Sequence, residues 1–90
     1  MGLINLLVFG KKNCYKCFYF MKTLDFSNID YTYIDIDDVD NEKICEDNDI
    51  DRVPHVQIIY NGDICFNSND ANILDVIRRV LILKNDNEIE

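Results

Sequence analysis

The first third of the chain passes from a continuous apolar run to a helical spacing of apolar residues. The run from Ile4 to Phe9 has the length of a strand covered on both faces, although periodicity alone also fits a buried helix segment. From just after Asn13 or Cys14, apolar residues recur at spacings of three and four, which predicts a helix that ends near Ser27-Asn28. The apolar face of this helix is expected to consist of Cys17, Phe18, Met21 and Leu24.

A second strand and a short helix are predicted in the middle of the chain. From Tyr31 to Ile36, every second residue belongs to one face and the residues between belong to the other, in a composition rich in β-branched and aromatic side chains, which predicts a strand. The two alternating sets are Thr32, Ile34 and Ile36, and Tyr31, Tyr33 and Asp35. Asp37, Asp38 and Asp40 can then cap a helix from about Val39 to Asp47. The apolar face of that helix is small and consists of Val39, Ile44 and Cys45.

Two further strands are predicted to form a hairpin. His55–Tyr60 has the pattern of a strand, and Ile64–Phe66 that of the strand that returns. Between them, Asn61-Gly62 is the strongest short signal for a tight hairpin turn, because both central residues of such a turn need a positive φ. We therefore expect these two strands to pair antiparallel.

A last helix is predicted after the hairpin, with Ser68 or Asn69 as its N-cap. Its apolar stripe is expected to be Ile73, Leu74, Ile77, Val80 and Leu81. Its basic residues, Arg78, Arg79 and Lys84, are expected toward the C-terminal end, where the helix dipole favours cations. We expect one domain over residues 1–84, followed by a polar tail, 85–90, that frays.

The order of elements is therefore β-α-β-α-β-β-α. The first two strands flank a helix, so they should be parallel and joined by a right-handed crossover. The fold class predicted is α/β: a four-stranded mixed sheet flanked by helices.

Composition and charge exclude several classes of protein. With 90 residues and 48% apolar residues, the chain is long enough for one modest core and too apolar for intrinsic disorder. No apolar run approaches the roughly 18 residues of a membrane-spanning helix, so no membrane partner is expected. Because the apolar run near the N-terminus has no basic region before it and no cleavage site after it, we expect a reducing, cytoplasmic location.

The net charge of −8 opposes binding to nucleic acid, which needs clustered lysines and arginines. The charge is unevenly distributed along the chain. Residues 1–24 contain four lysines and no acidic residue, whereas all 17 acidic residues follow. The lysines of this first segment are Lys11, Lys12, Lys16 and Lys22.

Cys14-Tyr15-Lys16-Cys17 lies directly after the first strand and at the start of the first helix. A helix N-terminus carries about half a positive charge, which together with the nearby lysines lowers a thiol pKa from its usual value of about 8.5. Cys14, at the exposed helix start, is the expected nucleophile on a disulfide sulfur. Cys17, about one turn into the helix on its apolar face, is the expected resolving thiol.

The remaining cysteines and the histidine do not form a metal-ligand pattern, so no metal site is expected. A structural zinc site would show a second C-x-x-C or a pair of histidines, whereas Cys45, His55 and Cys65 are widely separated. Cys45 and Cys65 are expected to be small buried apolar residues. His55 either touches substrate or tunes Cys14, or is a strand residue at the sheet edge. Asp70 is expected to cap a helix rather than bind a ligand.

Three features together resemble the thioredoxin-fold superfamily, in particular small glutaredoxin-like and thioredoxin-like proteins. They are the C-x-x-C after a strand, the segment from Ile50 to Pro54, and the strand after Pro54 that closes in a hairpin at Asn61-Gly62. The resemblance implies a cis Val53-Pro54 peptide beside the dithiol. It also implies that the backbone of Val53 pairs with bound substrate like an added strand.

Features of both subfamilies are present. Lys11 matches the lysine that glutaredoxins use near the carboxylate of glutathione, and Asn69-Asp70 could hold its amine and carboxylate. Val8 stands where thioredoxins carry a buried acid, and the thioredoxin tryptophan before the first cysteine is missing. The spacing from Pro54 to the hairpin resembles thioredoxin, and Asn67-Ser68 replaces the Gly-Gly of glutaredoxins.

We expect a dithiol oxidoreductase that exchanges disulfides with protein partners and acts as a monomer in electron transport. Its catalytic residues would be Cys14 and Cys17, and its substrate-binding residues Lys11, Tyr15, Lys16, Val53 and Pro54. No resident cofactor is expected, and either glutathione or a reductase would supply electrons. Two alternatives remain: a redox-inactive binding module, and a carrier of iron–sulfur or metal held by Cys14 and a glutathione thiol.

Overall fold

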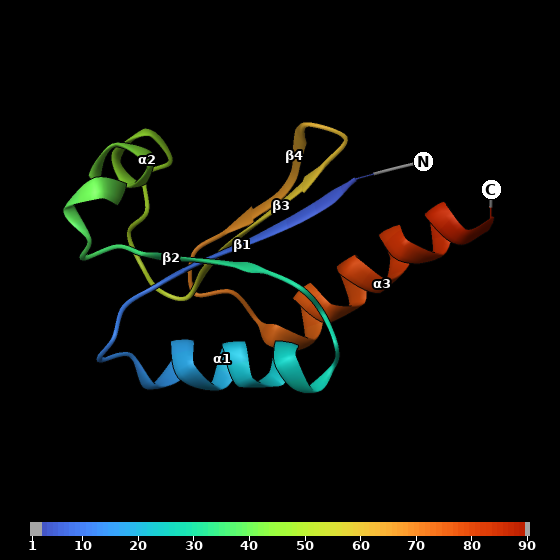
Figure 1. Cartoon of the computed structure of the whole chain (residues 1–90), viewed down its shortest axis with the longest axis horizontal. Coiled ribbons are helices and arrows are strands. Elements are labelled where there is room, and N and C mark those ends of the chain that lie inside the picture. Colours follow the sequence, from blue (N-terminus) through green and yellow to red (C-terminus); the bar gives the residue numbers. More distant parts are fainter. Residues whose placement is uncertain (1–2, 90) are drawn as a thin grey trace.

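The computed structural model describes residues 3–89 and contains the predicted order of elements. Four strands form one mixed sheet, and the helices lie around it (Figure 1). The elements are β1 (Ile4–Gly10), α1 (Tyr15–Phe26), β2 (Thr32–Asp35), the 3₁₀ helix η1 (Val39–Asn41), α2 (Glu42–Asp47), β3 (His55–Tyr60), β4 (Asp63–Ser68) and α3 (Ile73–Ile89). Within residues 3–89, no helix has both the length and the apolar character that crossing a bilayer needs.

The sheet has the strand order β2-β1-β3-β4, which confirms the predicted class and pairings. β1 pairs parallel with β2, and the three strands β1, β3 and β4 pair antiparallel. The hairpin turn is at Asn61 and Gly62, whose φ angles of 54° and 88° are both positive, as expected. β4 is longer than predicted, and the register shifts between Ile58 and Ile59.

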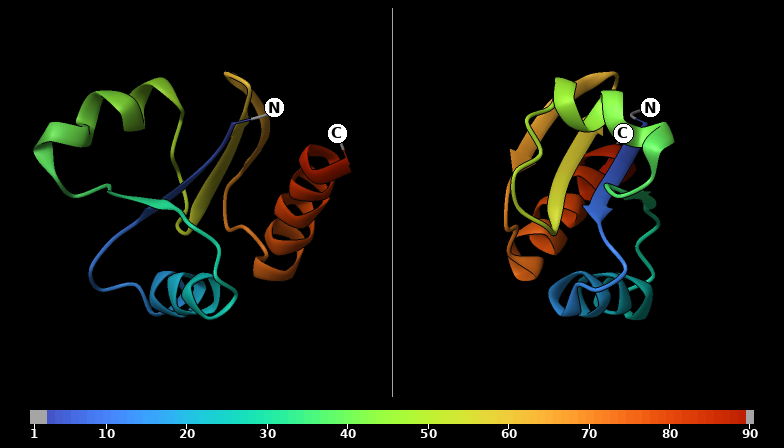
Figure 2. Two further views of the ribbon diagram at one scale, coloured as in Figure 1. Left: turned by 45° about the vertical axis from the view of Figure 1, so that its right-hand side comes forward. Right: turned by 90° about the vertical axis from the view of Figure 1, so that its left-hand side faces the viewer.

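One face of the sheet carries the main core, which α1 and α3 cover. Alternate residues of β1 and β3 point to this face, and both helices contribute apolar side chains between them. The buried cluster consists of Leu6, Val8, Phe20, Leu24, Ile29, Val56, Ile58, Val76 and Val80. Figure 2 shows α1 and α3 on the same side of the sheet, with α2 on the other. On that other side, the amide of Gln57 donates to Asn48 just after α2 (2.8 Å).

Both long helices bury a set of residues that matches the predicted one only in part: Cys17, Leu24 and Val80 were predicted and are buried. In α1 the buried positions are Cys17, Phe20 and Leu24, whereas Phe18 is 53% exposed. In α3 the fully buried residues include Val76 and Val80, and the predicted stripe residues Leu74 and Leu81 are exposed. Each observed set keeps the helical spacing of three or four residues, so the predicted periodicity is confirmed while part of the predicted face is not buried.

The segment after β2 differs from the single helix expected there. It begins as a 3₁₀ turn over Val39–Asn41 and becomes α-helical only at Glu42. Of the three aspartates proposed as caps, Asp38 takes this role, because its side chain accepts from the backbone N–H of Asp40 (3.0 Å). Val39 is exposed and contributes nothing to the apolar face predicted for it.

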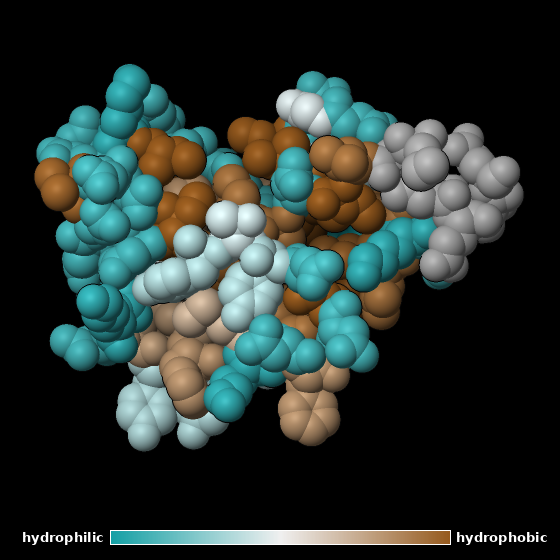
Figure 3. All heavy atoms as spheres, viewed as in Figure 1, coloured by the Kyte–Doolittle hydropathy of each residue, from teal (hydrophilic) through white to brown (hydrophobic). Residues whose placement is uncertain are grey.

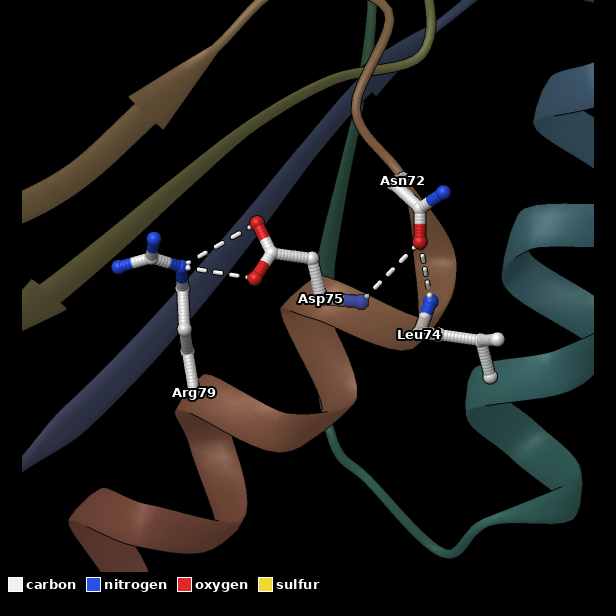
Figure 4. Close-up of polar contacts among 4 residues, drawn as sticks. All are labelled: Asn72, Leu74, Asp75 and Arg79. Carbon is white, nitrogen blue, oxygen red and sulfur yellow. Dashed lines mark hydrogen bonds and ion pairs between the residues drawn. The ribbon is translucent and has the colours of Figure 1, made fainter.

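The N-cap of α3 is Asn72, so the prediction of Ser68 or Asn69 is wrong. The Asn72 side-chain oxygen accepts from the N–H groups of Leu74 (3.0 Å) and Asp75 (3.2 Å), as Figure 4 shows. Ser68 is still part of β4, and the side chain of Asn69 contacts the ring of His55.

Asp70, also expected to cap a helix, has a positive φ of 48° in the loop before α3. The helix continues to Ile89, so Arg79 lies in its middle, where it pairs with Asp75 (3.3 Å; Figure 4). The expected domain boundary after residue 84 stays a prediction.

Candidate active site

Cys14 and Cys17 are joined by a disulfide at the start of α1, with their Cα atoms 5.2 Å apart. Cys14 is the N-cap residue and has an extended backbone (φ −109°, ψ 108°). Its Sγ accepts from the backbone N–H of Cys17 at 3.0 Å. A sulfur therefore occupies the place that a serine or aspartate oxygen takes at most helix starts, where free N–H groups favour negative charge.

The two sulfurs differ sharply in exposure. Cys17 is completely buried, whereas Cys14 is only partly buried and faces the surface. Gly10, at the end of β1, makes room for Cys17: a Cβ at Gly10 would lie 3.2 Å from Cys17 Sγ and 3.1 Å from the ring of Tyr33. Gly10 was not among the predicted site residues, although its position four residues before the first cysteine is plain in the sequence.

Val53-Pro54 is a cis peptide, as the resemblance implied. Val53 and Cys14 line the same surface cavity of about 480 Å³, together with Lys11 and Lys16. Pro54 is buried, and its carbonyl accepts from the N–H of Ala71 (3.0 Å). The structure thus places Lys11, Cys14 and Lys16 beside the loop before β3, whereas Tyr15 does not line this cavity.

The charge around this cavity is more mixed than the sequence suggested. Lys11 and Lys16 are exposed at its rim, and Arg52 adds a third cation. Asp51 and Asp70 line the same cavity, and Lys16 Nζ lies 3.6 Å from Asp70. The acid-free stretch of sequence therefore does not form an acid-free surface, because loops far along the chain contribute carboxylates.

Solved structures with a similar fold were found for nearly the whole chain. Thioredoxin 1 from Thermosipho africanus TCF52B gives a TM-score of 0.68 at 20% identity, covering 90% of this chain and 98% of that one. Oxidised thioredoxin from Plasmodium falciparum gives 0.70 at 15% identity, covering 89% and 80%. Oxidised thioredoxin O2 from Arabidopsis thaliana gives 0.73 at 15% identity, covering 90% and 75%. The chain has the thioredoxin fold. No protein-family model and no curated protein matches its sequence.

In this thioredoxin fold, His55 follows the cis proline and is buried rather than placed at a sheet edge. Its ring lies edge-on to Phe9, with the centroids 5.6 Å apart. Its Nδ1 lies 2.6 Å from the side-chain oxygen of Asn69, and its Nε2 lies 2.5 Å from that of Asn67. Neither alternative given for His55 foresaw this role, which ties β3 to the end of β4 and the loop after it.

The two cysteines outside the C-x-x-C are less buried than predicted. Cys45, on α2, is half-buried, and burial raises the pKa of its thiol. Cys65, on the edge strand β4, is exposed, and its Sγ donates to the carbonyl of Ile58 (3.4 Å). In the part of the chain that the structure describes, no three His, Cys, Asp or Glu side chains are grouped as metal ligands would be.

Proposed function

We propose that the protein is a thiol–disulfide oxidoreductase that exchanges disulfides with other polypeptides. The observation that carries this proposal is the Cys14–Cys17 disulfide at a helix N-terminus, with one sulfur near the surface and the other buried. Once the disulfide is reduced, the Cys17 N–H directed at Cys14 Sγ favours a thiolate there. Cys14 is therefore the attacking thiol and Cys17 the resolving thiol.

The reaction is written in the reducing direction. The Cys14 thiolate attacks one sulfur of the partner disulfide, so that a Cys14–partner bond forms, the partner S–S bond breaks, and the leaving sulfur takes up a proton. Cys17 then loses its proton and attacks Cys14 Sγ, which restores the Cys14–Cys17 bond and releases the second partner thiol. The partner gains two electrons and two protons, and a thiol reductant such as glutathione or a reductase returns the protein to its dithiol form.

The loop before β3 offers a place for the partner's backbone. Val53 borders the cavity that also exposes Cys14. Among residues 3–89, no hydrogen bond uses the backbone N–H or C=O of Val53. An extended segment next to the partner's cysteine can pair with these groups as an added strand, which would bring its disulfide to Cys14.

Reduction of insulin by dithiothreitol, followed by turbidity, tests the proposal. The wild-type protein should accelerate it, and Cys14→Ser or Cys17→Ser should return the rate to that of dithiothreitol alone. Only Cys17→Ser, which keeps the attacking thiol, should accumulate a mixed disulfide on a non-reducing gel. The double variant Cys45→Ser/Cys65→Ser is the matched control and should keep the wild-type rate.

A wild-type rate equal to that of dithiothreitol alone would contradict the proposal and favour a binding module without turnover. Colour and bound iron after anaerobic purification would favour the carrier of clusters instead. The electron source is assigned by following NADPH in two arms, one with glutathione and its reductase and one with thioredoxin reductase.

A further inference from the structure

We propose that the outer face of α1 is a docking surface for an acidic, apolar-rich segment of the partner polypeptide that flanks its disulfide. The inference rests on the proposed function and adds the class of substrate. The surface, called here the α1 aromatic surface, consists of Tyr15, Phe18, Tyr19 and Lys22 on the helix and Lys12 in the turn before it. It is distinct from the cavity at Val53, although both reach Cys14.

The aromatic side chains of this surface are exposed to solvent and do not belong to the hydrophobic core. Tyr15, Phe18 and Tyr19 are 78%, 53% and 59% exposed, within one turn and a half of helix. The rings of Tyr15 and Tyr19 stack (5.6 Å between centroids), and Phe18 meets Tyr19 edge-on (5.7 Å). Figure 3 shows pale and tan side chains protruding below the molecule, along α1. Contiguous exposed rings of this kind mark interaction sites.

The α1 aromatic surface opens directly onto the reactive sulfur. Lys12, Tyr15, Phe18 and Tyr19 line a surface pocket of about 490 Å³ whose wall also contains Cys14. A side chain of the partner that enters this pocket would lie beside the sulfur that attacks the disulfide. The contacts among the rings restrict their motion before binding, which reduces the side-chain freedom lost on docking.

Charge identifies the occupant as acidic. Lys22 Nζ lies 5.6 Å from the centroid of the Phe18 ring, and Lys12 lines the pocket itself. The first turn of α1 contains no acidic residue, whereas the whole chain carries a net charge of −8. An acidic polypeptide is repelled by most of this protein and attracted at the α1 aromatic surface, which orients its approach.

Two synthetic disulfide peptides test the inference. Both peptides contain the same disulfide-closed loop and the same leucine. The acidic peptide carries glutamates beside the loop, and the basic peptide carries lysines at the same positions. We expect kcat/KM to be about tenfold higher for the acidic peptide at low ionic strength, and the ratio to fall toward one in high salt. The small neutral bis(2-hydroxyethyl) disulfide, which carries no charge for the lysines to attract or repel, reports the dithiol chemistry alone.

Matched variants locate the effect. Lys22→Glu should lower the acidic-to-basic ratio about fivefold, while Lys84→Glu on α3, with the same change in net charge, should leave it unchanged. Phe18→Ser should lower kcat/KM for both peptides about threefold, whereas Phe26→Ser at the exposed end of α1 should not.

The outcomes separate the two proposals. Equal kcat/KM for the two peptides with a normal rate on the neutral disulfide would overturn the docking inference alone. An equal effect of Lys22→Glu and Lys84→Glu would also overturn it, since the preference would then follow net charge. No reduction of any of the three disulfides would overturn the proposed function. If a variant of α1 does not fold, the salt dependence of the acidic-to-basic ratio of kcat/KM, measured on the wild-type protein, still tests the docking inference.

Discussion

The side-chain oxygen of Asn69 lies 2.6 Å from Nδ1 of His55 and also accepts from the backbone N–H groups of Asp51 and Arg52, each at 3.3 Å. One amide thus joins a buried ring on β3 to the loop that ends at Val53-Pro54. Since Val53 borders the cavity at Cys14, this amide positions the backbone that we propose pairs with substrate.

Asn69→Ala should lower the free energy of unfolding by about 1–3 kcal/mol, because it removes the side-chain partner of the buried ring nitrogen and the acceptor of two backbone N–H groups. It should also raise KM for a disulfide peptide without a matching fall in kcat. Urea unfolding and peptide kinetics check both effects.

Asn67→Ala provides the comparison for Asn69→Ala. It removes the other partner of His55 but no hydrogen bond to residues 51 and 52, so it should lower stability and leave KM unchanged. An equal rise of KM in both variants would show that Asn69 acts only through the stability of the fold.

Gly10→Ala tests how closely β1 approaches the dithiol. The added methyl group would lie 3.1–3.2 Å from atoms of Tyr33 and Cys17, which is closer than carbon normally approaches carbon or sulfur. We expect a loss of about 1–3 kcal/mol in the free energy of unfolding and a slower resolving step, seen as longer-lived mixed disulfide.

Gly62→Ala is the control for the glycine substitution at β1. A Cβ there would meet nothing within 4 Å, but the φ of +88° disfavours alanine. Its cost should be about 1–2 kcal/mol with no change in the rate at which mixed disulfide disappears. If Gly10→Ala destabilises without affecting that rate, Gly10 is not part of the site.

The order of the elements could be predicted from the sequence because it depends on local signals. The Asn61-Gly62 turn, the apolar run of β1 and the helix start at Cys14 each depend on neighbouring residues alone. The position of the cis peptide came from the resemblance and not from any local rule, since a proline bond is cis in only about 5–6% of cases.

The surroundings of the site could not be predicted, because they depend on which distant segments meet. Asp51 and Asp70 reach the cavity at Cys14 from two loops that no spacing in the sequence relates to it. The buried face of α1 is set by the sheet above it, so Phe20 is buried rather than Phe18. The partners of His55 could not be predicted either, because the pairing of β3 with β4 decides which side chains of β4 and of the following loop lie beside its ring.

Asn72→Ala should destabilise the protein by about 1 kcal/mol, because the first turn of α3 loses the acceptor for two N–H groups. Asn72→Asp keeps an acceptor there and should be close to wild type. Ser68→Ala should change stability by less than about 0.5 kcal/mol, since Ser68 lies in β4 rather than at the helix start. A larger loss from Ser68→Ala than from Asn72→Ala in thermal unfolding would contradict the assignment of the cap.

Cys45 and Cys65 should differ in their reactivity toward iodoacetamide when Cys14 and Cys17 are oxidised. Cys65 is exposed, whereas Cys45 is half-buried and burial raises the pKa of its thiol. Only the thiolate reacts, so at neutral pH a smaller fraction of Cys45 is reactive, and its rate should still be rising at a pH where an ordinary cysteine has levelled off. Peptide mapping by mass spectrometry over a pH series follows each site separately, and the single variants Cys45→Ser and Cys65→Ser confirm the assignment. Faster labelling of Cys45 than of Cys65 at neutral pH would mean that α2 opens more readily than its packing implies.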